Sequence, residues 1–599
     1  MQKATLRILA TTDLHAHVFG WDYNADLPRS GIGMSDLAQM IDAARRDCPN
    51  TVLVDNGDFL QGSALGDWAA EAGPDAPHPV ISAMNVMGYD AATLGNHEFS
   101  HGLPVLQRAI AEADFPIISA NLAFTGNDHQ IAKSTVLARV ITVRDGTEHP
   151  LAIGITGIAP ALTTTWEAAQ IDGRVDTLPT VPAIRTAVAE LRKAGADLVI
   201  LLAHAAWHGA QDQGEDLHAL EQLEVDAVIL GHLHGVFPPP EGSTGGRCEM
   251  PALLAGKPAV MAGFFGSHLG QIDLTLGWTE RGWHVCEARS EAILSRPAQV
   301  AHQGIESVCR PAHEATRQWL DERIGVSSIH LQSYFARIHP SNIIRLIAAA
   351  QASHVREGLR GTGLGDLPLL SAAAPFRAGG RGGSTNFTDI PAGALQLRHL
   401  AEIYPFPNSV VALAVTGAEL EDWLERAVIQ FATLEPGREG DALLREDSPS
   451  FDFDLIDDLA FRIDLTQPPR FDALGRQIGQ GRRIRELTFR GQPIARENRF
   501  ILATNSFRAS GSGGFAGCRP ERIVLDRRIP ARTVVADYLA AGFGADPGRG
   551  FRWTYAPVGT GVIIETSVNS APYLTDIAAL RPQAVAGARP GFQRFHLWL

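Results

Sequence analysis

The feature that most constrains the fold of this 599-residue chain is a pattern repeated along its first half: a short apolar run, a polar cluster, then a helical stretch. Most of the apolar runs are rich in β-branched residues and almost free of charge, as strands buried on both faces require. They lie at Leu6–Ala10, Thr51–Val54, Ala91–Leu94, Pro116–Ala120, Leu151–Ile155, Asp197–Ala203 and Asp226–Leu230. Helical periodicity separates several of them, as in Met34–Arg46 and Pro182–Ala194. This alternation predicts an α/β fold with layered sheets.

A second α/β region follows a long amphipathic helix. The helix is predicted over Ile305–Ile324, and we interpret it as the connector between two domains. Beyond it the chain predicts further elements: helices near Ser341–Glu357 and Gly417–Phe431, and strands near Leu369–Ala372, Leu459–Leu465 and Phe500–Ala503. We therefore divide the chain into a first domain, 1–300, a connecting helix and linker, 301–335, and a second domain, 336–599.

Charge and cysteine content exclude several kinds of function. The chain has 51 Lys and Arg residues against 66 Asp and Glu residues, a formal net charge of −15. A protein that binds nucleic-acid polymers or anionic membranes needs a basic face, so we expect neither partner. No stretch approaches the ~18 consecutive apolar residues of a membrane span. The five cysteines lie far apart without a CxxC pair, which disfavours a thiolate zinc site and a disulfide framework.

The first residues bear on the compartment. Leu6–Asp13 has the pattern of a strand that leads into the first motif, so we expect no signal peptide ahead of it. The sequence then predicts a cytoplasmic protein, and a periplasmic one if a leader has been removed.

Polar clusters follow five of the predicted strands directly. They are Thr11–His15, Asp55–Asp58, Leu94–Glu98, Leu201–His204 and Leu230–His234. Each cluster alone has an ordinary explanation, such as a turn at Asp13 or a buried core histidine at His204. In open α/β sheets, however, binding sites form outside the carboxyl ends of the strands. The five clusters would therefore converge if these strands share a sheet.

The combined clusters have the composition of a metal site. Histidine and carboxylate ligands without cysteine suit a divalent ion such as Mn²⁺, Fe²⁺ or Zn²⁺. The seven candidates are Asp13, His15, Asp58, Asn96, His204, His232 and His234. Seven ligands are too many for one tetrahedral site but enough for two ions with one ligand shared. Paired ions are typical of phosphoryl hydrolysis, because they activate water and stabilise the leaving oxygen.

The ordered set also carries a resemblance. The segments Asp13-x-His15, Gly57-Asp58, Gly95-Asn96-His97-Glu98, His204 and Gly231-His232-x-His234 resemble the signature of the calcineurin-like metallophosphoesterases. The resemblance implies that Asp13, His15 and His234 hold one ion. It implies that Asn96, His204 and His232 hold the other, with Asp58 between them. His97 would not bind metal but would stabilise developing charge or protonate the leaving oxygen.

The second half resembles the carboxy-terminal domain of the 5′-nucleotidase family. The matching segments are Ser371–Phe376, Tyr404–Asn408, Phe451–Asp457 and Asn505–Ser510. Within that family the chain is most similar to the bacterial 2′,3′-cyclic-nucleotide 2′-phosphodiesterase/3′-nucleotidase group. The similarity includes Trp21–Tyr23, His78–Val80 and Ser371–Pro375. The resemblance implies a layered α/β/β/α metallophosphoesterase domain followed by a second α/β domain that binds the nucleobase.

The same resemblance implies which residues contact the substrate. The base would stack between Phe451 and Phe507, with Phe453 an alternative to Phe451. Stacking is worth ~1–3 kcal/mol per base and tolerates any base. Because Phe451 and Phe453 alternate in a predicted strand, one of them can instead belong to the core. Arg377 and Arg381 flank Gly379–Gly380 and are candidate contacts for phosphate or ribose oxygens.

One position departs from the family pattern. In 5′-nucleotidases an Asp commonly follows the Asn-His-Glu-Phe run and orients the catalytic histidine, whereas this chain has Ser100 there. The partner of His97 is therefore left open. Glu98 is next in sequence but is interpreted as a supporting or helix-start residue.

These observations predict a phosphoesterase that uses two divalent ions (Mn, Zn, Fe or Co). It would open 2′,3′-cyclic nucleotides to 3′-nucleotides and then remove the 3′-phosphate. Three alternatives remain: a 5′-nucleotidase or nucleotide-sugar hydrolase, a sulfur-ester hydrolase on the same scaffold, and a catalytically silent binding module. The complete ligand set disfavours the last.

Overall fold

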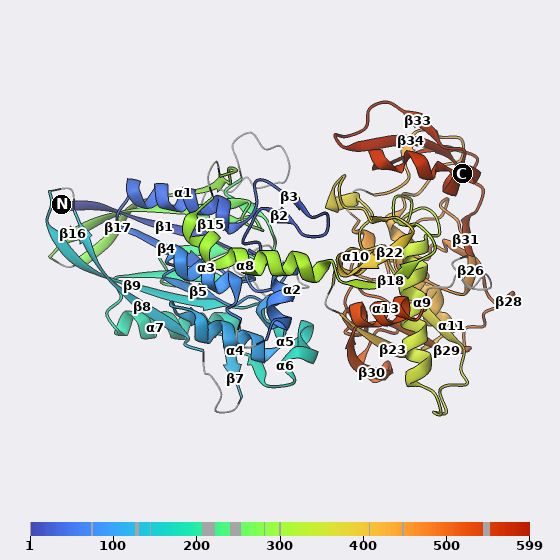
Figure 1. Cartoon of the computed structure of the whole chain (residues 1–599), viewed down its shortest axis with the longest axis horizontal. Coiled ribbons are helices and arrows are strands. Elements are labelled where there is room, and N and C mark those ends of the chain that lie inside the picture. The colour runs from blue at the N-terminus through green and yellow to red at the C-terminus, as the bar shows by residue number, and fades with distance from the viewer. Residues whose placement is uncertain are drawn as a thin grey trace. The chain divides into compact units, whose positions relative to one another are not determined.

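The computed structural model forms two compact units, Met1–Leu320 and Asp321–Leu599 (Figure 1). It describes residues 2–599 except 74–75, 126–130, 144, 206–221, 240–252, 255, 281, 299–300, 407, 446–447 and 543–551. The boundaries predicted at 300 and 336 stay a prediction. Within the described ranges, no helix combines the length and the apolar character that a membrane crossing requires.

The first sheet of the first unit has six strands. Their order is β17 (Gly282–Leu294), β16 (His268–Thr279), β1 (Gln2–Thr11), β4 (Thr51–Asp55), β5 (Ala91–Thr93) and β6 (Ile117–Ile118). Strands β1, β4, β5 and β6 run parallel, and β16 and β17 add an antiparallel edge. Three of the five polar clusters follow β1, β4 and β5, so they leave the sheet at one edge.

The second sheet supplies the other two clusters. Its order is β13 (Val236–Phe237), β15 (Lys257–Ala262), β12 (Ala227–Leu230), β11 (Leu198–Ala203), β9 (Glu148–Ile158) and β8 (Ser134–Thr142), with β14 (Leu253–Leu254) beside β15. The five strands before the clusters therefore do not share one sheet. The clusters still converge, because apolar residues of both sheets, such as Ile8, Val54, Ile155 and Ile200, form one buried core between them.

Helices cover these sheets and connect their strands. Helix α7 (Thr180–Lys193) packs Ile184, Val188 and Leu191 onto the second sheet, and α1 (Met34–Asp47) lies against β16. Smaller helices follow the strands of the first sheet: α2 (Ala64–Glu71), α3 (Pro79–Met87) and α4 (Leu103–Glu112). Proline at the first turn of α3 and Gly88 at φ 65° after it set that helix's ends.

Helix α8 (Gln303–Leu320) corresponds to the predicted connector, but it belongs to the first unit. It packs against α2 and α3 and buries Ile305, Cys309 and Leu320. The chain then enters β18 (Arg323–Ser327), so Ile324, predicted as helical, lies in a strand. The amphipathic pattern of α8 thus reflects packing within one unit.

The second unit contains three larger sheets around one core. The first, of five strands, has the order β25 (Leu455–Ile456), β20 (Leu369–Ala373), β29 (Arg499–Asn505), β23 (Ser409–Thr416) and β30 (Ile523–Pro530). The second is β24 (Asp441–Ala442), β32 (Gly561–Ser567), β34 (Phe592–Trp598) and β33 (Gln583–Val585). The third is β28 (Gln492–Pro493), β27 (Ile484–Phe489), β26 (Leu459–Ile463) and β31 (Arg552–Tyr555).

Helices α9 (Asn342–Gly358), α11 (Gly417–Ala427) and α13 (Ala531–Ala540) pack beside β23 of the five-stranded sheet. Helix α11 begins where the sequence specifies it: Thr416 and Glu419 each accept a hydrogen bond from the other's backbone N–H, a capping box. Helix α12 (Ser506–Ala509) follows β29 directly and carries one of the predicted aromatic residues. The α/β class predicted for both regions is confirmed.

Candidate dinuclear metal centre

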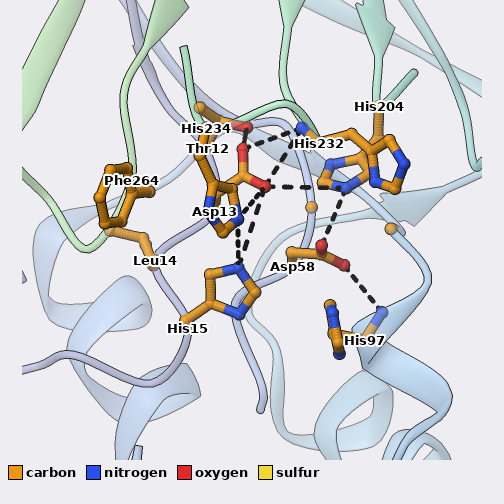
Figure 2. A network of polar contacts seen from close by, with 12 residues as sticks. Thr12, Asp13, Leu14, His15, Asp58, His97, His204, His232, His234 and Phe264 are labelled. Carbon is orange, nitrogen blue, oxygen red and sulfur yellow. Dashed lines mark hydrogen bonds and ion pairs between the residues drawn. The ribbon is translucent and has the colours of Figure 1, made fainter. Parts of the chain in front are cut away.

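Two groups of metal-type side chains lie where the carboxyl ends of the two sheets meet. Figure 2 shows histidine rings from both sheets directed toward two buried aspartates. Within each group the ligand atoms all lie within 4.8 Å of one another. The first group is Asp13, His15 and His234, and the second is Asp58, His204 and His232. The structure thus brings six of the seven predicted ligands into the two sets that the resemblance implied.

The first group is centred on Asp13, whose side chain is fully buried. Its Oδ1 lies 3.4 Å from Nε2 of His234 and 4.0 Å from Nε2 of His15. The two Nε2 atoms lie only 2.9 Å apart. Thr12 donates to Oδ2 of Asp13 at 2.6 Å, which leaves Oδ1 directed at the imidazoles.

The second group is centred on Asp58. Its Oδ2 lies 3.0 Å from Nε2 of His204, and its Oδ1 accepts the backbone N–H of His97 at 2.8 Å. Asp13 Oδ1 is 3.9 Å from the same His204 nitrogen. The two groups are therefore adjacent. Burial acts to lower the pKa of His15 in the first group and that of His204 in the second, and the charge of Asp58 acts to raise both.

The backbone of these loops is strained in a way that favours a functional role. Five of the seven candidates have positive φ: Asp13 at 51°, His15 at 46°, Asp58 at 58°, His232 at 71° and His234 at 55°. Each such non-glycine residue costs on the order of 1 kcal/mol, and the conformation persists only where the surroundings impose it. This strain turns the side chains inward to a common point.

Two glycines leave the space that the buried aspartates and their neighbours occupy. A Cβ at Gly95 would lie 2.2 Å from Oδ1 of Asp58, and a Cβ at Gly231 would lie 2.2 Å from Oγ1 of Thr12. No other residue fits at either place without displacing the aspartates. The glycines of the Gly-Asn-His-Glu and Gly-His-x-His segments therefore serve close packing around the site.

Hydrogen bonds to backbone carbonyls orient two of the imidazoles. Nδ1 of His15 donates to the carbonyl oxygen of Gln61 at 2.7 Å, and Nδ1 of His204 donates to that of Asn56 at 2.6 Å. With the proton on Nδ1, the lone pair of a neutral ring is on Nε2, which faces the aspartates. Burial lowers the pKa of His15 to about 3 and that of His232 to about 4, so both rings are neutral.

The donor set fits two divalent ions. The buried Oδ1 of Asn96 and Nε2 of His232 have no hydrogen-bond partner within the described part of the chain. A buried polar atom without a partner costs free energy, and coordination of a metal ion would offset that cost. At His204, burial alone would lower the pKa, but Asp58 and Asp13 raise it to about 10. The two carboxylates thus favour a positive charge beside Nε2, which a bound cation would supply in place of the proton. Nitrogen and oxygen donors without sulfur suit the borderline and hard divalent ions.

Glu98 supports the loop between β4 and α2. Its fully buried carboxyl accepts the backbone N–H groups of Asp58, Phe59, Leu60 and Gly95 at 2.6–3.1 Å. It is therefore a supporting residue, as interpreted from sequence, and its oxygens are not available to His97.

Three residues near the centre have no signal in the sequence. Trp166 stacks on His232, with ring centroids 5.4 Å apart, and Phe264 stacks on His234 at 4.9 Å. Glu167 accepts a hydrogen bond from Ser100, which in turn lies 3.2 Å from Nδ1 of His97. None of the three belongs to a recognisable motif, and only their spatial position connects them to the site.

The second unit holds the predicted base-binding residues. Phe507, on α12, is 41% exposed, and Phe451 is half-buried. Arg508 joins the two segments, because its side chain donates to the carbonyl oxygen of Phe451 at 2.7 Å and pairs with Asp454 at 3.0 Å. Phe507 and Phe451 therefore remain candidates for stacking.

Phe453, the alternative, cannot stack on a base. It is fully buried, with Phe431 and Trp553 edge-on at 5.5 Å and 5.7 Å. The strand predicted over these residues is instead a short 3₁₀ helix, η5 (Ser450–Asp452), and Phe453 follows it directly with its ring in the core. Arg377 is half-buried with Glu402 at 3.9 Å, and the side chain of Arg381 lies outside the described residues. Neither arginine is tested as a substrate contact.

The layered fold and the paired ligand groups define the first unit as a metallophosphoesterase. A family model described as calcineurin-like phosphoesterase matches residues 6–236, and one described as 5′-nucleotidase, C-terminal domain, matches residues 323–518. The chain belongs to the family that combines these two domains. The family and the two ligand groups together support two divalent metal ions in this protein.

Sequence similarity to known proteins extends along most of the chain. It is 35% identical to the 2′,3′-cyclic-nucleotide 2′-phosphodiesterase/3′-nucleotidase of Yersinia enterocolitica, over 90% of this chain and 86% of that protein. It is 34% identical to the trifunctional nucleotide phosphoesterase YfkN of Bacillus subtilis, over 95% of this chain but only 40% of that protein's length. A 5′-nucleotidase precursor of Thermus thermophilus shares the fold, with a TM-score of 0.58 at 20% identity over 92% of this chain and 99% of that one. The resemblance inferred from sequence is confirmed.

Proposed function

We propose that the chain hydrolyses 2′,3′-cyclic nucleotides to 3′-nucleotides, and 3′-nucleotides to nucleoside and phosphate. The observation that carries the proposal is the pair of ligand groups, each with its ligand atoms within 4.8 Å of one another. The chain is also similar over most of its length to a protein named 2′,3′-cyclic-nucleotide 2′-phosphodiesterase/3′-nucleotidase. YfkN supports a nucleotide phosphoesterase more generally, although this chain spans less than half of it.

Two bound divalent ions (Mn, Zn, Fe or Co) would supply water activation and charge stabilisation at the phosphate. The chain's own residues would hold and orient the substrate. Asp13, His15 and His234 form one holding group, and Asp58, His204 and His232 with Asn96 form the other. Trp166 and Phe264 pack on the outer imidazoles and limit their rotation.

His97 would act on the leaving oxygen. Its backbone N–H is bound to Asp58 at 2.8 Å and its Nδ1 faces Ser100, so Nε2 is the nitrogen available to the reaction. From that atom it would donate a proton to the departing ribose oxygen, the role of a general acid.

The second unit would recognise the base. Phe507 is partly exposed, and Arg508 beside it donates a hydrogen bond to the carbonyl oxygen of Phe451. This arrangement suits stacking on a nucleobase without preference for one base. The acidic chain favours small nucleotides over nucleic-acid polymers as substrates. A cytoplasmic location stays a prediction.

A panel of four substrates tests the proposal: 3′-AMP, 2′,3′-cyclic AMP, 5′-AMP and a nucleotide sugar, each with chelated protein and after Mn²⁺ is restored. We expect phosphate release, or ring opening, from the first two and much slower release from 5′-AMP. Dominant 5′-AMP hydrolysis would replace the proposed specificity by that of a 5′-nucleotidase. No turnover with metal restored would contradict the nucleotide assignment and favour the sulfur-ester or binding-module alternatives.

A further inference from the structure

A hydrogen-bonded chain leads from His97 away from the metal centre. Nδ1 of His97 lies 3.2 Å from Oγ of Ser100, and Ser100 donates to Oε1 of Glu167 at 3.1 Å. A hydroxyl has one hydrogen and accepts through its lone pairs. Since that hydrogen goes to Glu167, Ser100 must accept from Nδ1–H of His97. The contact therefore fixes the tautomer and leaves Nε2 for the reaction.

Glu167 is buried for no evident structural benefit. The residue is 7% exposed, and within the described residues Ser100 is the only hydrogen-bond partner of its side chain. Burial raises the pKa of this carboxyl to about 8. A buried carboxyl with a single partner costs free energy, and such costs concentrate at functional sites.

The local structure does not use this carboxyl either. Glu167 lies between two short helices, α5 (Thr163–Trp166) and α6 (Ala168–Ile171), and its backbone makes the helical hydrogen bonds. The side chain leaves both helices and reaches Ser100, 67 positions earlier in the chain. Glu98, the other nearby acid, is fully engaged by backbone N–H groups.

We propose that Glu167 is a positioning residue that acts through the hydroxyl of Ser100 to hold the imidazole of His97. The two residues together replace the single carboxylate that would otherwise follow the Asn-His-Glu-Phe run. The role depends on an acceptor oxygen and not on the charge of Glu167. Oε1 accepts the Ser100 hydrogen in the ionised carboxyl and also in the neutral carboxyl when its proton is on Oε2. The inference rests on the proposed role of His97.

Single variants give the first test. Ser100→Ala and Glu167→Ala each remove one member, and we expect kcat on 3′-AMP to fall about 10–100-fold with KM within about twofold. The kcat of the double variant should be no lower than that of either single variant, because each single change already breaks the same chain of hydrogen bonds. Glu167→Gln keeps an acceptor oxygen and should retain activity within about threefold. Glu190→Ala, an exposed residue of α7, is the matched control.

A second background separates positioning from a structural effect. Ser100→Asp places a carboxylate directly on His97, so Glu167→Ala should then cost less than about twofold. An equal cost of Glu167→Ala in both backgrounds would overturn the proposal. If Ser100→Asp does not fold, the comparison of Glu167→Gln with Glu167→Ala decides alone: equal losses overturn it. Metal content of each variant, measured in parallel, should match the parent chain.

A base-free substrate keeps this test independent of the nucleotide assignment. The same variants are assayed on phenyl phosphate, which needs no base recognition and whose phenolate, unlike p-nitrophenolate, still needs a proton donor to leave. If the parent chain cleaves this ester but no nucleotide, the proposed function fails while the relay is still tested by the variants. If the parent chain with metal restored cleaves neither, both the proposed function and the relay are overturned.

Discussion

The two units differ in how tightly their candidate functional residues are held. In the first unit, ligands from four loops have atoms within 4.8 Å of one another in each group, and most have positive φ. In the second unit, the predicted aromatic residues range from fully buried Phe453 to 41% exposed Phe507. A metal centre needs particular atoms at particular distances, whereas a stacking surface needs only an accessible ring. The positions of the candidate functional residues are therefore constrained much more tightly in the first unit than in the second.

The largest expected effect is at the predicted shared ligand of the metal centre. Asp58→Ala should lower kcat/KM on 3′-AMP by at least about 10⁴-fold. The ions would stabilise the transition state by several kcal/mol, and each 1.36 kcal/mol lost lowers the rate about tenfold. Phosphate release measures it. Asp176→Asn, at an exposed position of β10 (Val175–Thr177), should be unchanged. Retained turnover in Asp58→Ala would show that hydrolysis does not need the closely placed ligands that distinguish the first unit from the second.

The next effect separates core from surface in the second unit. Phe453→Ala should lower the free energy of unfolding by about 4 kcal/mol, because its ring is fully buried against Phe431 and Trp553. Denaturant unfolding of this variant beside Phe453→Leu, which should lose less, provides the measurement. A change below about 1 kcal/mol would place Phe453 outside the core.

A pH dependence follows from the ion pair beside the aromatic segments. Burial raises the pKa of Asp454 to about 6, and Arg508 offsets this only in part. A carboxyl whose folded-state pKa lies above its unfolded value stabilises the fold most below about pH 4 and loses that contribution as pH rises through about 6. Unfolding free energy relative to Asp454→Asn should therefore decline by up to about 3 kcal/mol between pH 4 and 7. A rise over that interval would show that the ion pair outweighs burial.

The smallest expected effect is on base recognition. Phe507→Ala should raise KM for 3′-AMP by about 30-fold, near 2 kcal/mol, with little change in stability because the residue is 41% exposed. Phe507→Tyr keeps a ring and should behave as the parent chain. Titration of several 3′-nucleotides should show the same loss for each base. An unchanged KM would remove Phe507 from the proposed base site.

The sequence predicted the α/β elements and the ligand groups because both have local signatures. Apolar runs ended near the observed strand ends, and His232 and His234 follow β12 as expected. It could not show that the strands before the clusters belong to two sheets, since strand order depends on long-range pairing. It could not separate Phe453 from Phe451, because the strand expected there is a short 3₁₀ helix, and the turn decides which ring enters the core. Glu167 was missed because its role depends on a contact with a distant serine.

The most direct test of the central claim, a two-metal phosphoesterase, is to titrate chelated protein with Mn²⁺ while hydrolysis of 2′,3′-cyclic AMP and bound metal are measured together. Turnover should be lost on chelation and should return in proportion to binding, saturating near two ions per chain. Turnover that survives complete removal of metal, or that saturates at a single ion, would contradict the account.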